Sequence, residues 1–70
     1  MQGMPLTQRE QQVLDALSSP ATNAQIGQAL GITTHTVQDH ILKLYRKIGG
    51  KNRIQLLIAA ERSGLIRMFS

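Results

Sequence analysis

The segment from Asn23 to Ile48 contains two helical patterns that are separated by only a few residues. The first pattern has an inner face made of Ile26, Ala29 and Leu30. Gly31 follows it at the position where many helices end in a left-handed conformation, and Thr33 can cap the next helix. At 100° per residue, the apolar residues of the second pattern project within about 60° of one another: Val37, Ile41, Leu44 and Ile48. Two helices joined by so tight a turn predict a helix-turn-helix, whose second helix enters the major groove of DNA.

Two further helices are predicted on either side of this segment. Thr7 and Glu10 have the spacing of a capping box, so that a helix is expected over about residues 7–18. Thr22 or Asn23 caps the helix that follows, with Gln25 as a possible partner of Thr22. A last helix is expected over about residues 52–63, closed by Gly64. The sequence therefore predicts an all-α, compact four-helix bundle without a wing over residues 6–66, preceded by a disordered segment (residues 1–5) and followed by a tail (residues 67–70).

Gly27 lies in the middle of the first of the paired helices. A glycine there costs roughly 1 kcal/mol relative to alanine. We expect close approach of another helix to be the reason, with simple tolerance of the glycine as the alternative.

Composition bounds the class of protein. Seventy residues make one domain, and without cysteine neither disulfides nor a thiolate metal site can support its core. The first residues lack the charged and apolar regions of a signal peptide, and no apolar run approaches the roughly 20 residues that span a bilayer. We therefore expect a cytoplasmic protein.

The positive charge of the chain is clustered. Eight Lys and Arg against four Asp and Glu give a net charge of +4. Five of the cations lie within eleven residues: Lys43, Arg46, Lys47, Lys51 and Arg53. Such clustering is typical of phosphate binding. A solvated helix end, where the macrodipole favours cations, is an equally good explanation.

The outward sides of the last two helices carry different residues. The side of the third helix opposite its apolar stripe holds polar and charged residues together with one leucine: His35, Gln38, Asp39, Leu42, Lys43 and Arg46. On the last helix, Ile54 and Ile58 lie one turn apart and away from the expected core. This second apolar face predicts a partner surface. The alternative is that the tail, through Leu65, Ile66, Met68 and Phe69, folds back over it.

The residue inventory argues against an enzyme. His35 and His40 diverge by about 140° on one helix and cannot share a metal ion. Tyr45 is expected to pack at the core boundary. The carboxylates are scattered, and there is no glycine-rich phosphate loop. We expect no catalytic residue, no metal and no cofactor.

Residues 6–66 resemble the LuxR/FixJ-type (GerE-like) DNA-binding domain. The matching positions are Leu6-Thr7, Arg9-Glu10, Val13-Leu14, Asn23, Ile26, Leu30-Gly31-Ile32, Thr36-Val37, His40-Ile41, Lys47-Ile48, Asn52-Arg53, Ala60 and Gly64-Leu65-Ile66. The resemblance implies a bacterial transcription regulator that binds double-stranded DNA. It makes His40 a packing residue beside Val37 and Leu44, with a role in DNA binding or catalysis as the alternative. It also implies a homodimer through the last helix, with Ile54, Ile58, Glu61 and Arg62 at the interface. In most members this domain ends a longer chain that bears a phosphoacceptor receiver or a small-molecule sensor, so the sequence is either such a C-terminal domain or a stand-alone regulator.

The chain departs from the family at three positions of the third helix. Where the family commonly presents lysine, a small or apolar residue, and lysine, this chain has Gln38, Asp39 and Leu42. Gln38 can bond adenine, Asp39 can accept from the N4 amino group of cytosine, and Leu42 can touch a thymine methyl. With His35 these residues form the expected base-contacting set. The expected phosphate contacts are Thr33, Thr34, Lys43, Arg46, Lys47, Lys51 and Arg53.

Two alternatives stay open. The missing cations favour a protein-interaction module or antagonist that keeps the fold and pairs with a DNA-binding family member, or a domain that also contacts RNA polymerase. A promoter reader of the sigma-factor type has a similar helix-turn-helix, but the pattern through Gly64, Leu65 and Ile66 argues against it.

Overall fold

Four helices follow one another within residues 5–66, the part of the chain that the computed structural model describes. They are α1 (Gln8–Leu17), α2 (Asn23–Leu30), α3 (Thr34–Ile48) and α4 (Arg53–Arg62). No strand occurs between residues 5 and 66, so the predicted all-α, four-helix fold is confirmed. The expectations for residues 1–4 and 67–70 fall outside the described residues.

The helices begin at the predicted caps. The Thr7 hydroxyl accepts from the Glu10 amide at 3.1 Å, and the Glu10 carboxylate accepts from the Thr7 amide at 2.9 Å. Thr22 and Gln25 make the same reciprocal pair at the start of α2, at 3.2 and 2.9 Å. These contacts satisfy backbone donors that a helix start leaves free. Because each pair spans only three residues, the local sequence sets these boundaries.

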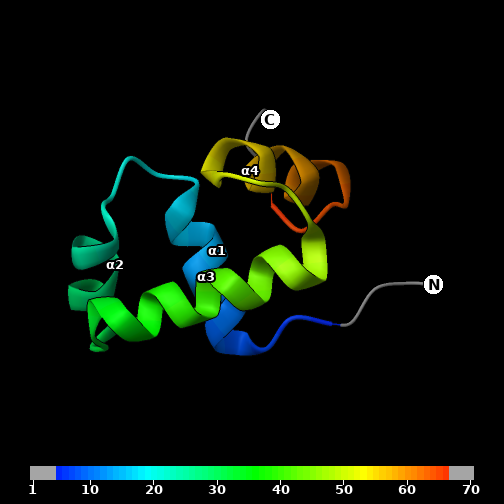
Figure 1. The fold of residues 1–70 in the computed structure, drawn as a ribbon. Coiled ribbons are helices and arrows are strands. Elements are labelled where there is room, and N and C mark those ends of the chain that lie inside the picture. The colour runs from blue at the N-terminus through cyan, green and yellow to red at the C-terminus, as the bar shows by residue number, and fades with distance from the viewer. Residues whose placement is uncertain (1–4, 67–70) are drawn as a thin grey trace.

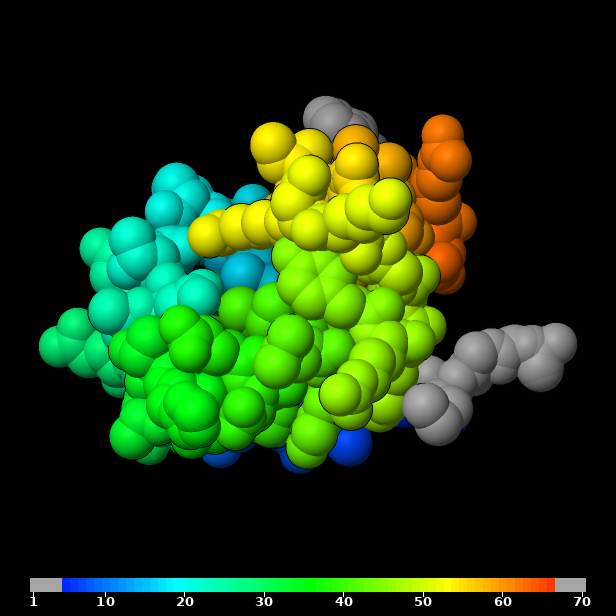
Figure 2. Space-filling model, viewed as in Figure 1, coloured from blue at the N-terminus to red at the C-terminus, as the bar shows by residue number. Residues whose placement is uncertain are grey.

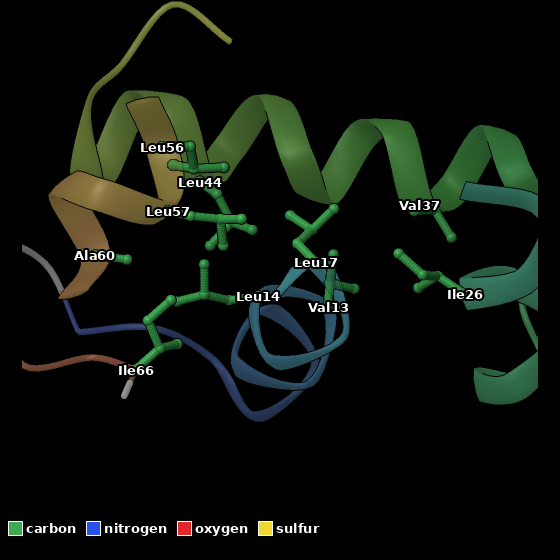
Figure 3. Packing of buried hydrophobic residues seen from close by; sticks show 10 residues of the cluster. All are labelled: Val13, Leu14, Leu17, Ile26, Val37, Leu44, Leu56, Leu57, Ala60 and Ile66. Atoms are coloured by element: carbon green, nitrogen blue, oxygen red, sulfur yellow. The ribbon is translucent and has the colours of Figure 1, made fainter. Parts of the chain in front are cut away.

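The long helix α3 is the centre of the bundle. It packs against α1, α2 and α4, with α2 beside its N-terminal half and α4 above its C-terminal end (Figure 1). Figure 3 shows the buried residues meeting between the helices: Val13, Leu14, Leu17, Ile26, Val37, Leu44, Leu56, Leu57, Ala60 and Ile66. Within the predicted α3 stripe, Val37 and Leu44 are fully buried, whereas Ile41 and Ile48 are partly buried against this core.

Gly27 is crowded, but by a different neighbour from the one predicted. A Cβ atom at Gly27 would lie 2.6 Å from the carbonyl oxygen of Ile32 and 3.3 Å from the carbonyl carbon of Thr33. The neighbour is therefore the backbone of the turn, not another helix. We expected a second helix to approach Gly27, and this expectation was wrong. Gly31 is left-handed as predicted (φ 73°), and the turn that follows it folds back over α2.

Gly50 performs a similar function between α3 and α4. Its φ of +94° is a conformation that L side chains rarely adopt. A Cβ atom there would lie 2.7 Å from the backbone nitrogen of Leu56. The chain can therefore reverse directly against the first turn of α4.

The end of the described chain joins the core. Ile66 is buried, Leu65 packs against the core, and the Gln11 side chain donates to the Leu65 carbonyl at 3.0 Å. Ile54 and Ile58 stay 70% and 45% exposed. Leu65 and Ile66 thus do not cover the second apolar face of α4, while Met68 and Phe69 lie outside the described residues.

The lengths and hydropathies of the helices bear on membrane insertion. Among the described residues, no helix is both long and apolar enough to cross a bilayer.

Candidate nucleic-acid interface

One side of α3 is free of the other helices. Because α1, α2 and α4 all pack on α3, its remaining side faces solvent and forms a continuous surface in Figure 2. We call the predicted base-contacting residues on this side the reading face: His35, Gln38, Asp39 and Leu42. All four are exposed, and Leu42 is 55% exposed despite its apolar side chain.

A histidine and a carboxylate are neighbours on the reading face. His35 Nε2 lies 3.8 Å from an Asp39 carboxylate oxygen, one helical turn away. The two side chains are 83% and 56% exposed. They form an ion pair only when the histidine is protonated.

Three of the five clustered cations are exposed in the C-terminal half of α3 and in the turn that follows it. We call Lys43, Arg46 and Lys51 the basic end. Lys43 and Arg46 belong to the C-terminal half of α3, and Lys51 lies in the turn before α4. Long cationic side chains at such positions can reach an adjacent phosphate chain.

Lys47 is engaged within the protein. Its ammonium lies 2.6 Å from Glu10 Oε1 and also donates to the Pro5 carbonyl at 3.3 Å. The side chains of Lys47 and Glu10 are 15% and 3% exposed. The hydrogen bond from Lys47 and that from the Thr7 amide lower the pKa of the Glu10 carboxyl below its ordinary value, against the opposing effect of burial.

Arg53 is also engaged within the protein. Its guanidinium donates to the carbonyl of Leu17 at 2.9 and 3.2 Å and to that of Ser19 at 2.6 Å. Arg9 similarly donates to the Leu30 carbonyl at the end of α2, at 3.3 Å. These arginines satisfy carbonyls that the ends of α1 and α2 leave without helical partners. Lys47 and Arg53 were both expected among the phosphate contacts, and their internal partners were not predicted from the sequence.

A hollow opens beside the exposed side of α3. Figure 2 shows α1, in blue, at its floor between α2, α3 and the start of α4. It is lined by Leu17, Asn23, Ile41, Tyr45, Arg53 and Leu56. Tyr45 is partly buried and packs against the core from this side.

Three further residues, Thr33, Thr34 and His40, lie at or near the N-terminal half of α3. Thr33 caps α3, since its hydroxyl accepts from the Thr36 amide at 3.1 Å, and Thr34 is exposed. His40 is partly buried, and its Nδ1 atom is buried without a hydrogen-bond partner in the described structure. These positions place His40 with the interior and not with the reading face.

The predicted interface residues of α4 lie on a different side of this helix from its buried residues. Ile54, Ile58 and Arg62 are exposed, and Glu61 is partly buried. Ile58 and Arg62 also line a shallow groove with Gly50, Gln55, Ala59 and Ser63. The surface is therefore apolar at its centre, with Arg62 beside it.

The potential metal ligands of this chain are histidine, aspartate and glutamate side chains. Over residues 5–66, no three His, Cys, Asp or Glu side chains come together in a way that could hold a metal ion.

Comparisons with known proteins agree with this architecture. The family model for bacterial regulatory proteins of the luxR family matches residues 4–60. The HTH-type transcriptional regulator MalT of Vibrio campbellii is 44% identical over 57 residues, which cover 81% of this chain and 6% of MalT. MalT of Yersinia pestis is 41% identical over 58 residues, which cover 83% of this chain and 6% of that protein. This chain thus corresponds to a small part of these regulators.

Two solved structures of VqmA from Vibrio cholerae share the fold. The VqmA dimer without target DNA superimposes with a TM-score of 0.82 at 33% identity, covering 87% of this chain and 28% of VqmA. The VqmA–ligand–DNA complex gives a TM-score of 0.83 at 31% identity, covering 93% of this chain and 29% of VqmA. The family match spans α1, α2, α3 and most of α4. The chain is therefore a LuxR-type helix-turn-helix DNA-binding domain and belongs to the LuxR family of bacterial regulatory proteins.

Proposed function

We propose that this domain binds specific sequences of double-stranded DNA, with α3 in the major groove, as part of a bacterial transcription regulator. The observation that carries the proposal is the exposed side of α3, where the reading face runs into the basic end. A helix presented in this way can enter the major groove while its far end contacts the phosphate backbone. The relatives are consistent with this function, since MalT is a transcriptional regulator and VqmA has been solved with DNA.

Each residue of the reading face has a base that suits its chemistry. Gln38 can form two hydrogen bonds with adenine, and Asp39 can accept one from the N4 amino group of cytosine. Leu42 offers an apolar contact to a thymine methyl group. His35, near the N-terminus of α3, can contact a base or a phosphate.

The proposed phosphate contacts are fewer than the sequence suggested. Lys43, Arg46 and Lys51 are exposed, and Thr33 and Thr34 add hydroxyl and amide groups at the N-terminus of α3. We leave Lys47 and Arg53 out of the set because their donors already bind Glu10 and the carbonyls of Leu17 and Ser19. Three cationic contacts per copy predict modest affinity and a shallow dependence on salt.

A second copy would double these contacts. Ile54 and Ile58, flanked by Glu61 and Arg62, offer an apolar surface for a homodimer through α4. VqmA is described as a dimer. We propose that two copies bind a two-fold or direct repeat, and that the domain acts in the cytoplasm, where the bacterial chromosome lies, in contact with RNA polymerase.

The domain would then belong to a larger regulator. The chain spans 6% of the MalT proteins and under a third of VqmA, so a phosphoacceptor receiver or small-molecule sensor in the same protein would control it. Its own residues would supply recognition of DNA without a cofactor.

Selection of bound sequences from random duplex DNA, followed by fluorescence titration at several salt concentrations, tests the proposal. We expect enriched sequences that wild type binds more tightly than random DNA. Gln38→Ala should reduce this preference, whereas Gln12→Ala, at an exposed position of α1, should not. Failure of wild type to bind any duplex, even at low salt, would disprove the proposal.

A second function is favoured by the lack of any lysine or arginine on the reading face. In that case the domain would be an antagonist that pairs through α4 with a DNA-binding family member. Formation of a heterodimer with such a protein, together with no DNA binding by either the domain or the heterodimer, would favour this alternative.

A further inference from the structure

The reading face begins in a long stretch without full charges. Residues 16–38 contain no Lys, Arg, Asp or Glu, and they include the whole of α2, the turn and the start of α3. Asp39 is the first charged residue after this stretch. Asp39 is therefore the only Lys, Arg, Asp or Glu among the four residues of the reading face.

His35 is placed to offset that carboxylate. Its Nε2 atom lies 3.8 Å from Asp39 Oδ2, and both side chains are exposed. Lys43 lies one turn beyond Asp39, but over residues 5–66 no cationic nitrogen other than that of His35 comes within 4.0 Å of the Asp39 carboxylate. His35 is thus the one close partner of Asp39 in the described structure.

The ionisable groups of the packed helices have other positions. Those of α1 are Arg9, Glu10 and Asp15, those of α4 are Arg53, Glu61 and Arg62, and α2 has none. Arg9, Glu10 and Arg53 have internal partners, and Asp15 accepts from Gln11. On α3 itself, the other ionisable side chains are His40, Lys43, Tyr45, Arg46 and Lys47. None of these groups forms an ion pair with His35 within the described residues.

We propose that His35 and Asp39 form a proton-controlled pair that makes DNA binding stronger as the pH falls. The proposal rests on the proposed function of the reading face. With neutral histidine, the pair carries one negative charge towards a polyanion. With protonated histidine, the pair is neutral, and His35 gains a second N–H donor for a phosphate or a guanine acceptor. Histidine is the side chain whose charge ordinarily changes in the physiological range.

The size of the effect follows from counterion release. Addition of one positive charge at a DNA interface is equivalent to about one more neutralised phosphate. We therefore expect wild type to bind a mixed-sequence duplex roughly fivefold more tightly at about pH 5.5 than at about pH 8, at constant low ionic strength. The Glu10 carboxyl, whose pKa lies below its ordinary value of 4.5, stays ionised over this range.

The experiment is a fluorescence anisotropy titration with a labelled mixed-sequence duplex across this pH range. It compares wild type, His35→Gln, Asp39→Asn and the double variant, all checked for helical structure by circular dichroism at each pH. His35→Gln and the double variant should show a smaller pH dependence than wild type. Asp39→Asn should bind more tightly than wild type at both ends of the pH range, because the one carboxylate of the reading face is gone. His40 is present in all four proteins, so its contribution cancels in the comparison.

The outcomes separate this inference from the proposed function. Binding by all four proteins with the same pH dependence would overturn the His35–Asp39 pair and leave DNA binding intact. Asp39→Asn that binds DNA no more tightly than wild type at either pH would show that the carboxylate does not oppose DNA binding, which also overturns the inference. No binding by wild type at any pH would overturn the proposed function itself.

Discussion

The ammonium nitrogen of Lys47 lies 2.6 Å from Oε1 of Glu10, the same carboxylate oxygen that accepts from the Thr7 amide at 2.9 Å. One carboxylate thereby completes the cap of α1 and joins it to the last turn of α3. The contact links the start of the bundle to the helix that carries the reading face. Several expected properties of the domain depend on it.

Removal of the Lys47 ammonium should destabilise the fold. Lys47→Met keeps much of the apolar stem but leaves Glu10 as a nearly buried carboxylate without its cation. We expect the free energy of unfolding to fall by roughly 3 kcal/mol. Urea denaturation measures this loss, with Lys51→Met as the matched control at an exposed position. Equal stabilities for the two variants would show that the ion pair contributes nothing.

The same contact predicts how stability depends on pH. The folded-state pKa of Glu10 is lowered from its ordinary value of 4.5, so the folded protein binds this proton less readily than the unfolded chain. The stabilisation is therefore fully present above pH 4.5 and is lost as the pH falls through the lower folded-state pKa. Urea midpoints measured as the solution is acidified should fall less steeply for Glu10→Gln than for wild type. Parallel curves would contradict the assignment, because the other carboxyls are common to both proteins.

Gly27→Ala should destabilise the domain although alanine is the better helix former. The gain in helix propensity is about 1 kcal/mol. The added Cβ atom would meet the Ile32 carbonyl oxygen at 2.6 Å, and this oxygen belongs to the rigid turn. We expect a net loss of about 1–2 kcal/mol in a urea titration. Gln28→Ala, at an exposed position of α2, serves as the control and should change stability little.

The salt dependence of DNA binding should distinguish exposed cations from internal ones. Lys43→Ala and Arg46→Ala should each lower the slope of log affinity against log salt concentration by about 1 and weaken binding similarly on all sequences. Lys47→Met should leave the slope unchanged at temperatures where it is folded, because its ammonium faces Glu10. Titrations at a series of salt concentrations measure these slopes. A reduced slope for Lys47→Met would return this residue to the phosphate-contacting set.

Ile58→Glu should prevent self-association without unfolding the monomer. Ile58 is 45% exposed, so a carboxylate there can stay hydrated in the monomer but would be desolvated in a dimer through α4. Sedimentation of the variant and of wild type, with and without DNA, measures the association. Gln12→Glu adds the same charge at an exposed position of α1 and should associate like wild type. An unfolded Ile58→Glu would place Ile58 in the core and contradict the dimer surface.

The sequence by itself determined the four helices, since their signals are local. The hydroxyls of Thr7 and Thr22 reach amides only three residues away, and Gly31 ends α2 through its own backbone conformation. The apolar stripe of α3 then leaves one outward side, so the exposed positions of the reading face also follow from helical periodicity. These features need no knowledge of distant neighbours.

The tertiary structure decided which charges are available to a partner. Lys47 meets Glu10 across 37 positions and Arg53 meets Leu17 across 36, and no local pattern reveals such pairs. The sequence likewise indicated that Gly27 must be small, but only the folded turn identified the Ile32 carbonyl as the reason. The partner of a charged side chain is decided only when the chain folds. For this reason, only three of the five clustered cations are exposed, and the other two bind groups within the protein.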